Sequence, residues 1–238
     1  MKLRIKFAKS GVMRFIGHLD VMRYFQKALR RAEIDIAYTE GFSPHPVMSF
    51  AAPLGVGLES SGEYFDIEVC SYTTSADMKE RLNQVMAPGM EVLSVTMLGD
   101  KVKNAMASVA AASYLVRFRE GYEPDFDWIG QIKDFYSQPS IMVTKKTKKS
   151  EIELDLKPSI YQLSAKREEN GETAVYMLVD ASSAGNVKPS LVMNAFFKTI
   201  GRELPEYALQ VTRTETYTDI GGGEGQELAP LEEVGEIF

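Results

Sequence analysis

The sequence predicts an α+β protein built from two tandem ferredoxin-like units with antiparallel sheets. Three observations support this fold: short segments in which apolar and polar residues alternate, longer amphipathic segments at helical spacing, and the order β-α-β-β-α-β, which occurs twice. The predicted units cover residues 1–100 and 105–218, followed by an acidic tail rich in Gly and Glu at 219–238. Because no repeat of individual residues is visible, the duplication rests on the order of elements.

The first predicted unit opens with a strand over residues 2–8, where apolar side chains alternate with Lys2, Arg4 and Lys6. This alternation predicts a half-buried strand with a basic outer face. A helix is expected over 19–32, because apolar residues recur there at helical spacing. The remaining elements are predicted strands at 34–39, 47–52, 64–69 and 90–98, and a helix at 73–86 with an N-cap at Thr74 or Ser75.

The second predicted unit repeats the order with looser spacing. Its expected elements are strands at 113–119, 141–144, 152–156, 160–165, 175–179 and 207–214, and helices at 124–136 and 188–200. The glycines at 221–223 open the tail, whose composition predicts flexibility.

Charge is distributed very unevenly along the chain, whose net charge is -6. Residues 1–31 carry nine cations against one acid, Asp20, whereas residues 214–238 carry seven acids and no Lys or Arg. Such polarity predicts an anion-binding surface in the first part of the chain, although the protein is acidic overall.

Composition excludes several classes of site and location. Cys70 is the only cysteine, so the chain forms no internal disulfide, which suits a reducing compartment. A single cysteine also excludes a cysteine-rich zinc site or a cysteine-bound iron–sulfur cluster within this chain, and we expect no cofactor in it. No segment has the apolar length of a signal peptide or a membrane span, so we expect a cytoplasmic protein without a membrane partner.

Three segments in the first unit, 15–20, 38–46 and 53–63, concentrate residues capable of chemistry. The chain has only two histidines, His18 and His45, and they lie in the first two segments. Prolines on both sides of His45 stiffen its loop. We expect the two loops to converge beside the basic face, which makes His18, Asp20 and His45 the candidate catalytic residues.

The predicted substrate- or anion-binding residues combine cations, aromatic rings and loop residues. Arginine and lysine contact phosphates, exposed aromatic rings stack on unpaired bases, and glycines leave backbone amides open to an anion. The predicted set is Arg14, Arg23, Lys27, Arg30, Tyr38, Gly41, Phe42, Ser43, Glu63 and Tyr64.

Each feature also has an ordinary structural interpretation. His18 and Asp20 suit the first turn of a helix, and His45 suits a plain turn. The glycines of 53–63 match no phosphate-binding fingerprint, and helix cations often form a solvated face. A metal site built from His18, Asp20 and His45, or general acid–base work by either histidine, is chemically possible as well.

The sequence from Arg14 to Val69 carries a dense set of shared motifs. They are His-Leu-Asp at 18–20 with the arginines that follow, Gly-Phe before Pro-His-Pro at 41–46, and the Pro-Leu to Glu-Tyr stretch that ends at Tyr64. This part resembles a family of unknown function whose members are partners of, or fused to, radical S-adenosylmethionine (SAM) proteins with a cobalamin-binding region. The chain departs from the family pattern at Gly17, Ser43 and Val47, where the family favours Ser, Asn and Lys.

The resemblance implies an accessory or substrate-recognition protein that works with a radical SAM enzyme and binds RNA or a ribosomal component. It would not act as an autonomous enzyme. The alternative is a metal-independent RNA-processing endonuclease with His18 or His45 as general base and Arg14 or Arg23 stabilising the phosphorane, because tandem ferredoxin-like units are similar to CRISPR repeat-RNA endonucleases. A purely structural subunit is the third interpretation.

Overall fold

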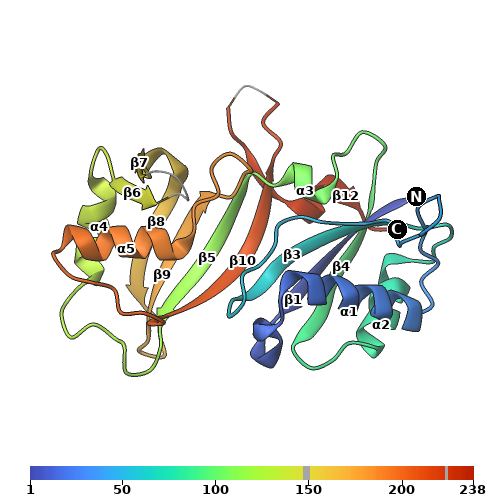
Figure 1. Cartoon of the computed structure of the whole chain (residues 1–238), viewed down its shortest axis with the longest axis horizontal. Coiled ribbons are helices and arrows are strands. Elements are labelled where there is room, and N and C mark those ends of the chain that lie inside the picture. Colours follow the sequence, from blue (N-terminus) through green and yellow to red (C-terminus); the bar gives the residue numbers. More distant parts are fainter. Residues whose placement is uncertain (147–150, 223–224) are drawn as a thin grey trace. The chain divides into compact units, whose positions relative to one another are not determined.

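The structure is a computed structural model that describes residues 1–146, 151–222 and 225–238 (Figure 1). The chain forms two compact units, one containing Met1–Ala110 and Arg213–Phe238, the other containing Ala111–Thr212. The predicted mixture of helices with mostly antiparallel strands is confirmed. The finer assignment of two ferredoxin-like units stays a prediction. The unit boundaries also differ from the expected ones, because residues 213–238 return to the first unit.

The first unit has an antiparallel sheet in which β1 is central. Its strands lie in the order β12-β4-β1-β3-β10, with β2 paired to β3 and β11 paired to β10. They are β1 (Lys2–Lys9), β2 (Met48–Phe50), β3 (Glu59–Glu68), β4 (Met90–Leu98), β10 (Leu209–Asp219, which enters this unit at Arg213), β11 (Leu228–Pro230) and β12 (Gly235–Glu236). The helical elements are η1 (Gly11–Phe15), α1 (His18–Arg31), α2 (Ser75–Gln84), α3 (Ala105–Ser108) and η3 (Leu231–Val234).

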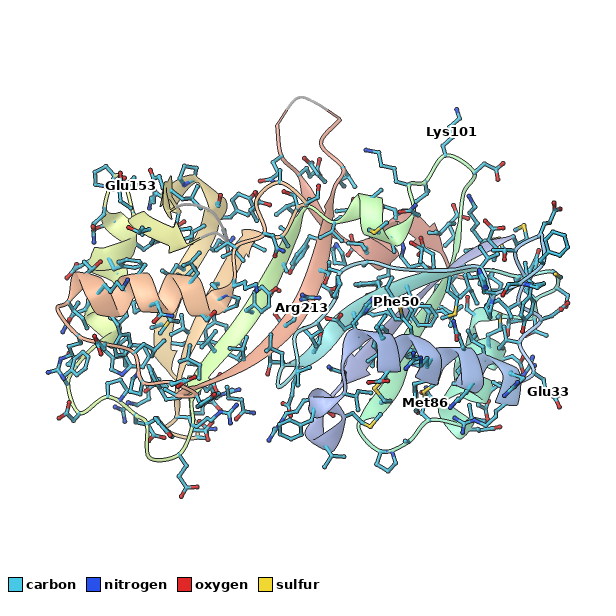
Figure 2. The ribbon with its side chains drawn as sticks, viewed as in Figure 1. Glu33, Phe50, Met86, Lys101, Glu153 and Arg213 are labelled. Carbon is cyan, nitrogen blue, oxygen red and sulfur yellow. The ribbon has the colours of Figure 1, made fainter. Side chains whose placement is uncertain are left out.

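The core of the first unit lies between the sheet and the helices α1 and α2, which cover the same face (Figure 1). Leu3, Ile5 and Phe7 of β1 are buried, as their alternation predicts, and contribute to one cluster with the apolar stripes of both helices. Phe50 lies on this face as well, stacked 4.8 Å from the ring of Phe65 (Figure 2). The side chain of Thr74 accepts a hydrogen bond from Asp77, which confirms the predicted N-cap of α2.

The opposite face of β1 is not the open basic surface that the alternation predicts. Arg4 is completely buried and binds the Asp66 carboxylate through two hydrogen bonds of 2.8 and 3.0 Å. Lys6 donates hydrogen bonds of 2.6 Å to both Glu215 and Glu232. Burial alone would lower the pKa of Lys6, but these two carboxylates outweigh it and raise the pKa above its ordinary value. The prediction of a solvated basic face is therefore wrong for Arg4 and Lys6.

The C-terminal segment covers this second face, although its composition predicts flexibility. Leu231 is fully buried and packs with Tyr64 and Ala105. The last strand, β12, pairs with β4, and the backbone of Phe238 exchanges hydrogen bonds with Ser75. Residues 225–238 are held in place because Glu232 pairs with Lys6 of β1 and Leu231 joins a second small core, whereas part of the predicted flexible stretch, 223–224, lies outside the described residues.

Gly62 is explained by close packing rather than by anion binding. A Cβ atom at this position would lie 2.4 Å from the Cα of Glu215 on β10. Its own N–H is buried and donates to the Ser60 hydroxyl. Gly62 therefore permits β10 to approach β3, which brings Arg213 and Glu215 into the first unit.

The second unit contains the antiparallel strands β5 (Ala111–Phe118), β9 (Thr173–Asp180) and β8 (Ile160–Arg167), in that order. The strands β6 (Met142–Lys146) and β7 (Glu151–Asp155) form a separate pair, η2 (Lys157–Ser159) precedes β8, and the helices are α4 (Ile129–Ser137) and α5 (Pro189–Thr199). α4 begins five residues later than the helix predicted for 124–136, because residues 124–128 are not helical and the chain bends at 125 and 126 ahead of the N-cap residue Trp128. Within the described part of the chain, no helix combines the length and hydropathy needed to span a bilayer.

We predict that Arg4→Met strongly destabilises the protein, because it leaves the buried Asp66 carboxylate without its counter-charge. The free energy of unfolding should fall by about 3–5 kcal/mol. Lys2→Met on the same strand is the control: Lys2 is exposed and lies 3.9 Å from Glu68, so its loss should cost under about 1 kcal/mol. Urea denaturation followed by circular dichroism measures both, and equal effects would contradict the structural role of Arg4.

Candidate functional site

His18, the first residue of α1, lines a small cavity in the first unit. Its imidazole meets the ring of Phe50 edge-on, with 5.4 Å between the ring centroids. The cavity volume is about 10 Å³, close to the minimum that one water molecule needs. Its polar lining consists of Lys9, His18 and Glu63, and its apolar lining of Phe7, Val21, Phe50, Ala52 and Leu54.

Buried charges surround this cavity. Glu63 on β3 forms an ion pair of 2.9 Å with Arg213 on β10, and both residues are buried. Lys9, at the end of β1, is also buried, and its Nζ donates to the Ile16 carbonyl oxygen at 3.3 Å. We call Lys9, His18, Glu63 and Arg213 the Lys9 cluster. The cluster joins the three strands β1, β3 and β10 to the start of α1, because each of these groups must find polar partners away from water.

The surroundings lower the pKa of both bases in the cluster, Lys9 and His18. Burial lowers the pKa of the Lys9 ammonium, Glu63 opposes this shift and Arg213 adds to it. Burial also lowers the pKa of His18. The Glu63 carboxylate opposes this shift, and the Lys9 ammonium adds to it. A neutral imidazole accepts a proton near pH 7, and a desolvated amine beside a cation is more nucleophilic than an ordinary lysine. The cavity, however, leaves room for little more than one water molecule beside them.

The other two candidate catalytic residues lie elsewhere. Asp20 is exposed, with its carboxylate 3.5 Å from Arg23. The loop of His45 is closed by the Thr39 N–H, which donates to the His45 carbonyl oxygen, and by the His45 N–H, which donates to the Thr39 hydroxyl. This loop lies beyond the Lys2 end of β1, because the preceding segment bridges to Val69, whose N–H donates to the Met1 carbonyl oxygen. Lys9 is at the opposite end of this strand, about 25 Å away along eight residues. The expected convergence of the two histidines is therefore not found.

The structure does not support a metal site built from His18, Asp20 and His45, because these three side chains do not converge. Among residues 1–146, 151–222 and 225–238, no group of three His, Cys, Asp or Glu side chains is close enough to hold a metal ion. His18, Asp20 and His45 in particular do not form one.

The predicted anion-binding residues separate into four places, which are β3, η1, the loop of His45 and α1. Tyr64 is buried and its hydroxyl donates to Glu215, so its ring is not exposed for stacking. Glu63 belongs to the Lys9 cluster, and Arg14 forms an ion pair of 3.1 Å with Glu59. Tyr38, Gly41, Phe42 and Ser43 are exposed on the loop of His45, where Gly41 has a φ of 113° that favours glycine.

The remaining cations lie on α1. Arg23, Lys27 and Arg30 are all exposed and follow one another at spacings of four and three residues, which places them on one side of the helix. Arg23 lies near Asp20, whereas Lys27 and Arg30 form no ion pair within the described part of the chain. We call Arg23, Lys27 and Arg30 the α1 cation row.

Two members of the Lys9 cluster, Lys9 and Arg213, are not among the residues predicted from the sequence for the site. Lys9 has the same parity as Leu3, Ile5 and Phe7, so the alternation of β1 already indicated a buried position. Arg213 gave no such signal, because its partner Glu63 is 150 residues away.

We predict opposite changes in the pKa of His18 from two neighbouring substitutions. Lys9→Met removes a nearby cation and should raise this pKa, whereas Glu63→Gln removes a carboxylate and should lower it further below 6.5. Two-dimensional NMR over a pH series measures the effect, and His45→Asn leaves His18 as the only histidine signal. A His18 pKa at or above 6.5 in the unaltered protein, or shifts of the same sign, would refute the described surroundings.

The sequence assigns this chain to a protein family. No curated protein matches it. A solved structure described as a Cbf5-Nop10-Gar1 complex contains a similar chain, with 12% sequence identity and a TM-score of 0.49 over 90% of this chain; the match spans 48% of that chain, about half its length. A family described as an uncharacterized protein conserved in bacteria (DUF2344) matches residues 2–189. This match covers well over half of the sequence, and the chain therefore belongs to the DUF2344 family.

Proposed function

We propose that the chain is an accessory or substrate-recognition protein that holds RNA, or an RNA-containing ribosomal component, along α1. The observation that carries this proposal is the α1 cation row, whose side chains remain exposed on one side of the helix. The buried cations Arg4 and Arg213, by contrast, are neutralised inside the fold. Cations left exposed in a row, on a protein of net charge -6, suit a polyanionic partner.

The finer features of the proposal have separate support. The motifs shared between 14 and 69 support a radical SAM protein as the partner, since the similar family acts beside such enzymes. The single cysteine, Cys70, supports a cytoplasmic location. For the first unit, the order β1-α1-β2-β3-α2-β4 and the neighbouring strands β4-β1-β3-β2 support a ferredoxin-like topology.

The size of the cation row sets the expected strength of binding. Three phosphate contacts give a slope of log K against log salt of about -2 to -3, depending on whether the RNA is single- or double-stranded. Affinity should then fall about 20- to 40-fold between 50 and 200 mM salt. Binding of this kind is weak in isolation, which suits a protein that presents a substrate to another enzyme.

We predict that Lys27→Glu combined with Arg30→Glu weakens RNA binding at 50 mM salt at least about tenfold, because two phosphate contacts become repulsive. Lys133→Glu with Lys198→Glu is the matched control: both residues are exposed on helices of the second unit, and the net charge changes equally. Fluorescence anisotropy with labelled RNA across a salt series measures the affinity. Absent or salt-independent binding rejects the proposal, and equal losses in both double variants reject the α1 site.

One observation favours a second candidate, the RNA-processing endonuclease. The lowered pKa of His18 leaves its imidazole neutral near pH 7, as a general base requires. Of the proposed phosphorane-stabilising arginines, Arg14 is bound to Glu59 and Arg23 lies near Asp20.

Incubating the protein alone with structured RNA in the presence of a chelator separates the two candidates. Metal-independent cleavage that disappears in His18→Ala or His45→Ala would establish the endonuclease. RNA that is bound but left intact favours the recognition protein. Binding and cleavage both absent would leave only a structural subunit.

A further inference from the structure

We propose that the α1 cation row continues into a stacking site for an unpaired nucleobase on Phe15, so that the preferred ligand is single-stranded RNA. This inference rests on the proposed function and narrows its substrate. None of the sequence-predicted stacking residues is involved: Tyr64 is buried, and Tyr38 and Phe42 lie on the loop of His45.

Phe15 is a large aromatic residue in an exposed position. Its exposed fraction is 57%, and it ends η1, just before α1 begins. Leu19 in the first turn of α1 is 65% exposed. From Leu19 the residues of the α1 cation row follow at spacings of four, four and three, so an apolar surface lies at the start of a line of cations on one side of the helix.

The dimensions suit a short single strand. From Arg23 to Arg30 the helix rises about 10 Å, which matches about three nucleotide steps at the 3.4 Å rise of a stacked strand. Phe15 precedes the N-terminal end of this row in the chain. In the proposed complex, the next base along the RNA would unstack from its neighbours there and stack on the Phe15 ring. A base stacked on an aromatic ring and a backbone held by cations are the two components of single-strand recognition.

The backbone that presents Phe15 is fixed from three sides. The Arg14 carbonyl oxygen accepts a hydrogen bond of 2.7 Å from Gly57, and the Gly11 N–H donates to Glu59 at 3.1 Å. Ser10 donates to the carbonyl of Gly89, a residue with a φ of 90° at which a Cβ atom would lie 2.5 Å from the Ser10 oxygen. A ring held on such a backbone loses little conformational entropy when a ligand binds, which favours affinity.

Arg14 adds a cation at the ring itself. Its guanidinium carbon lies 4.9 Å from the Phe15 ring centroid, and the ion pair with Glu59 holds it there. This arrangement orients the ring and places a positive group beside the position of a stacked nucleotide. The nearby exposed residues Val12 and Val56 would also suit a protein, but the adjacent line of cations favours a polyanion whose bases offer π faces.

We predict that Phe15→Ala weakens binding of single-stranded RNA about 5- to 100-fold, the range of one lost base–aromatic stack, and leaves the salt slope unchanged. Duplex RNA of the same length should bind Phe15→Ala and the unaltered protein equally, because its bases are not free to stack. Phe15→Tyr retains a π face and should keep the affinity. Phe15→Leu retains apolar contact without a π face and should behave like Phe15→Ala.

Anisotropy titrations with unstructured and duplex RNA measure these affinities, and thermal melts verify that the variants fold. RNA binding that depends on Lys27 and Arg30 but is unchanged in Phe15→Ala overturns the stacking site and leaves the proposed function standing. Equal losses for single-stranded and duplex RNA, or full affinity in Phe15→Leu, also overturn it. Absent RNA binding by the unaltered protein, combined with a partner protein captured by it and lost in Phe15→Ala, replaces both proposals with a protein-docking surface.

Discussion

The fold of the first unit depends on burying a complete ion pair between Arg4 and Asp66, which face each other directly in the register of β1 and β3. A buried guanidinium must satisfy its donors inside the protein, because leaving a charge unpaired there costs several kcal/mol. Arg4 does so through Asp66 and through the carbonyl oxygens of Leu231 and Lys103. Asp66 in turn accepts the N–H of Ala105 at the start of α3. The Arg4–Asp66 pair thus holds together β1, β3, the start of α3 and the C-terminal segment through hydrogen bonds.

Part of the charge polarity of the chain is neutralised inside the fold. Lys6 meets Glu215 and Glu232, so part of the acidic end of the sequence neutralises part of its basic beginning. Short, buried pairs of this kind determine which segment lies where, since each partner alone would be costly to bury. The cations on the exposed side of α1 remain accessible to the proposed partner. The cations of residues 1–31 therefore include some that are paired inside the fold, such as Arg4 and Lys6, and those of the α1 cation row, which we propose bind RNA.

The Lys9 cluster and the proposed RNA surface are connected through the backbone. Lys9 donates to the carbonyl oxygen of Ile16, the residue that follows Phe15, and His18 begins the helix that bears the cation row. The buried charges under the N-terminal end of α1 thereby position the segment from η1 into α1. The Lys9 cluster surrounds a cavity that can hold about one water molecule. This small cavity suits a positioning role, because that role does not require a substrate to enter.

The sequence by itself determined the elements that local patterns specify. Alternation identified β1 and its buried Leu3, Ile5 and Phe7, helical periodicity identified α1, and a hydroxyl ahead of Asp77 identified the cap of α2. These features depend on residues only a few positions apart, so local sequence patterns are enough to predict them.

Only the tertiary structure decided which charges are buried and which histidine joins a polar cluster. The partners of Arg4, Glu63 and Lys6 lie 62, 150 and 209 residues away, and alternation cannot distinguish a strand face that meets water from one covered by a distant segment. The separation of His45 from His18 likewise follows because His18 packs near the Lys9 end of β1, whereas the loop of His45 lies beyond the Lys2 end. The physical reason is that burial depends on what packs above a residue, and local periodicity carries no information about a segment that arrives from the other end of the chain.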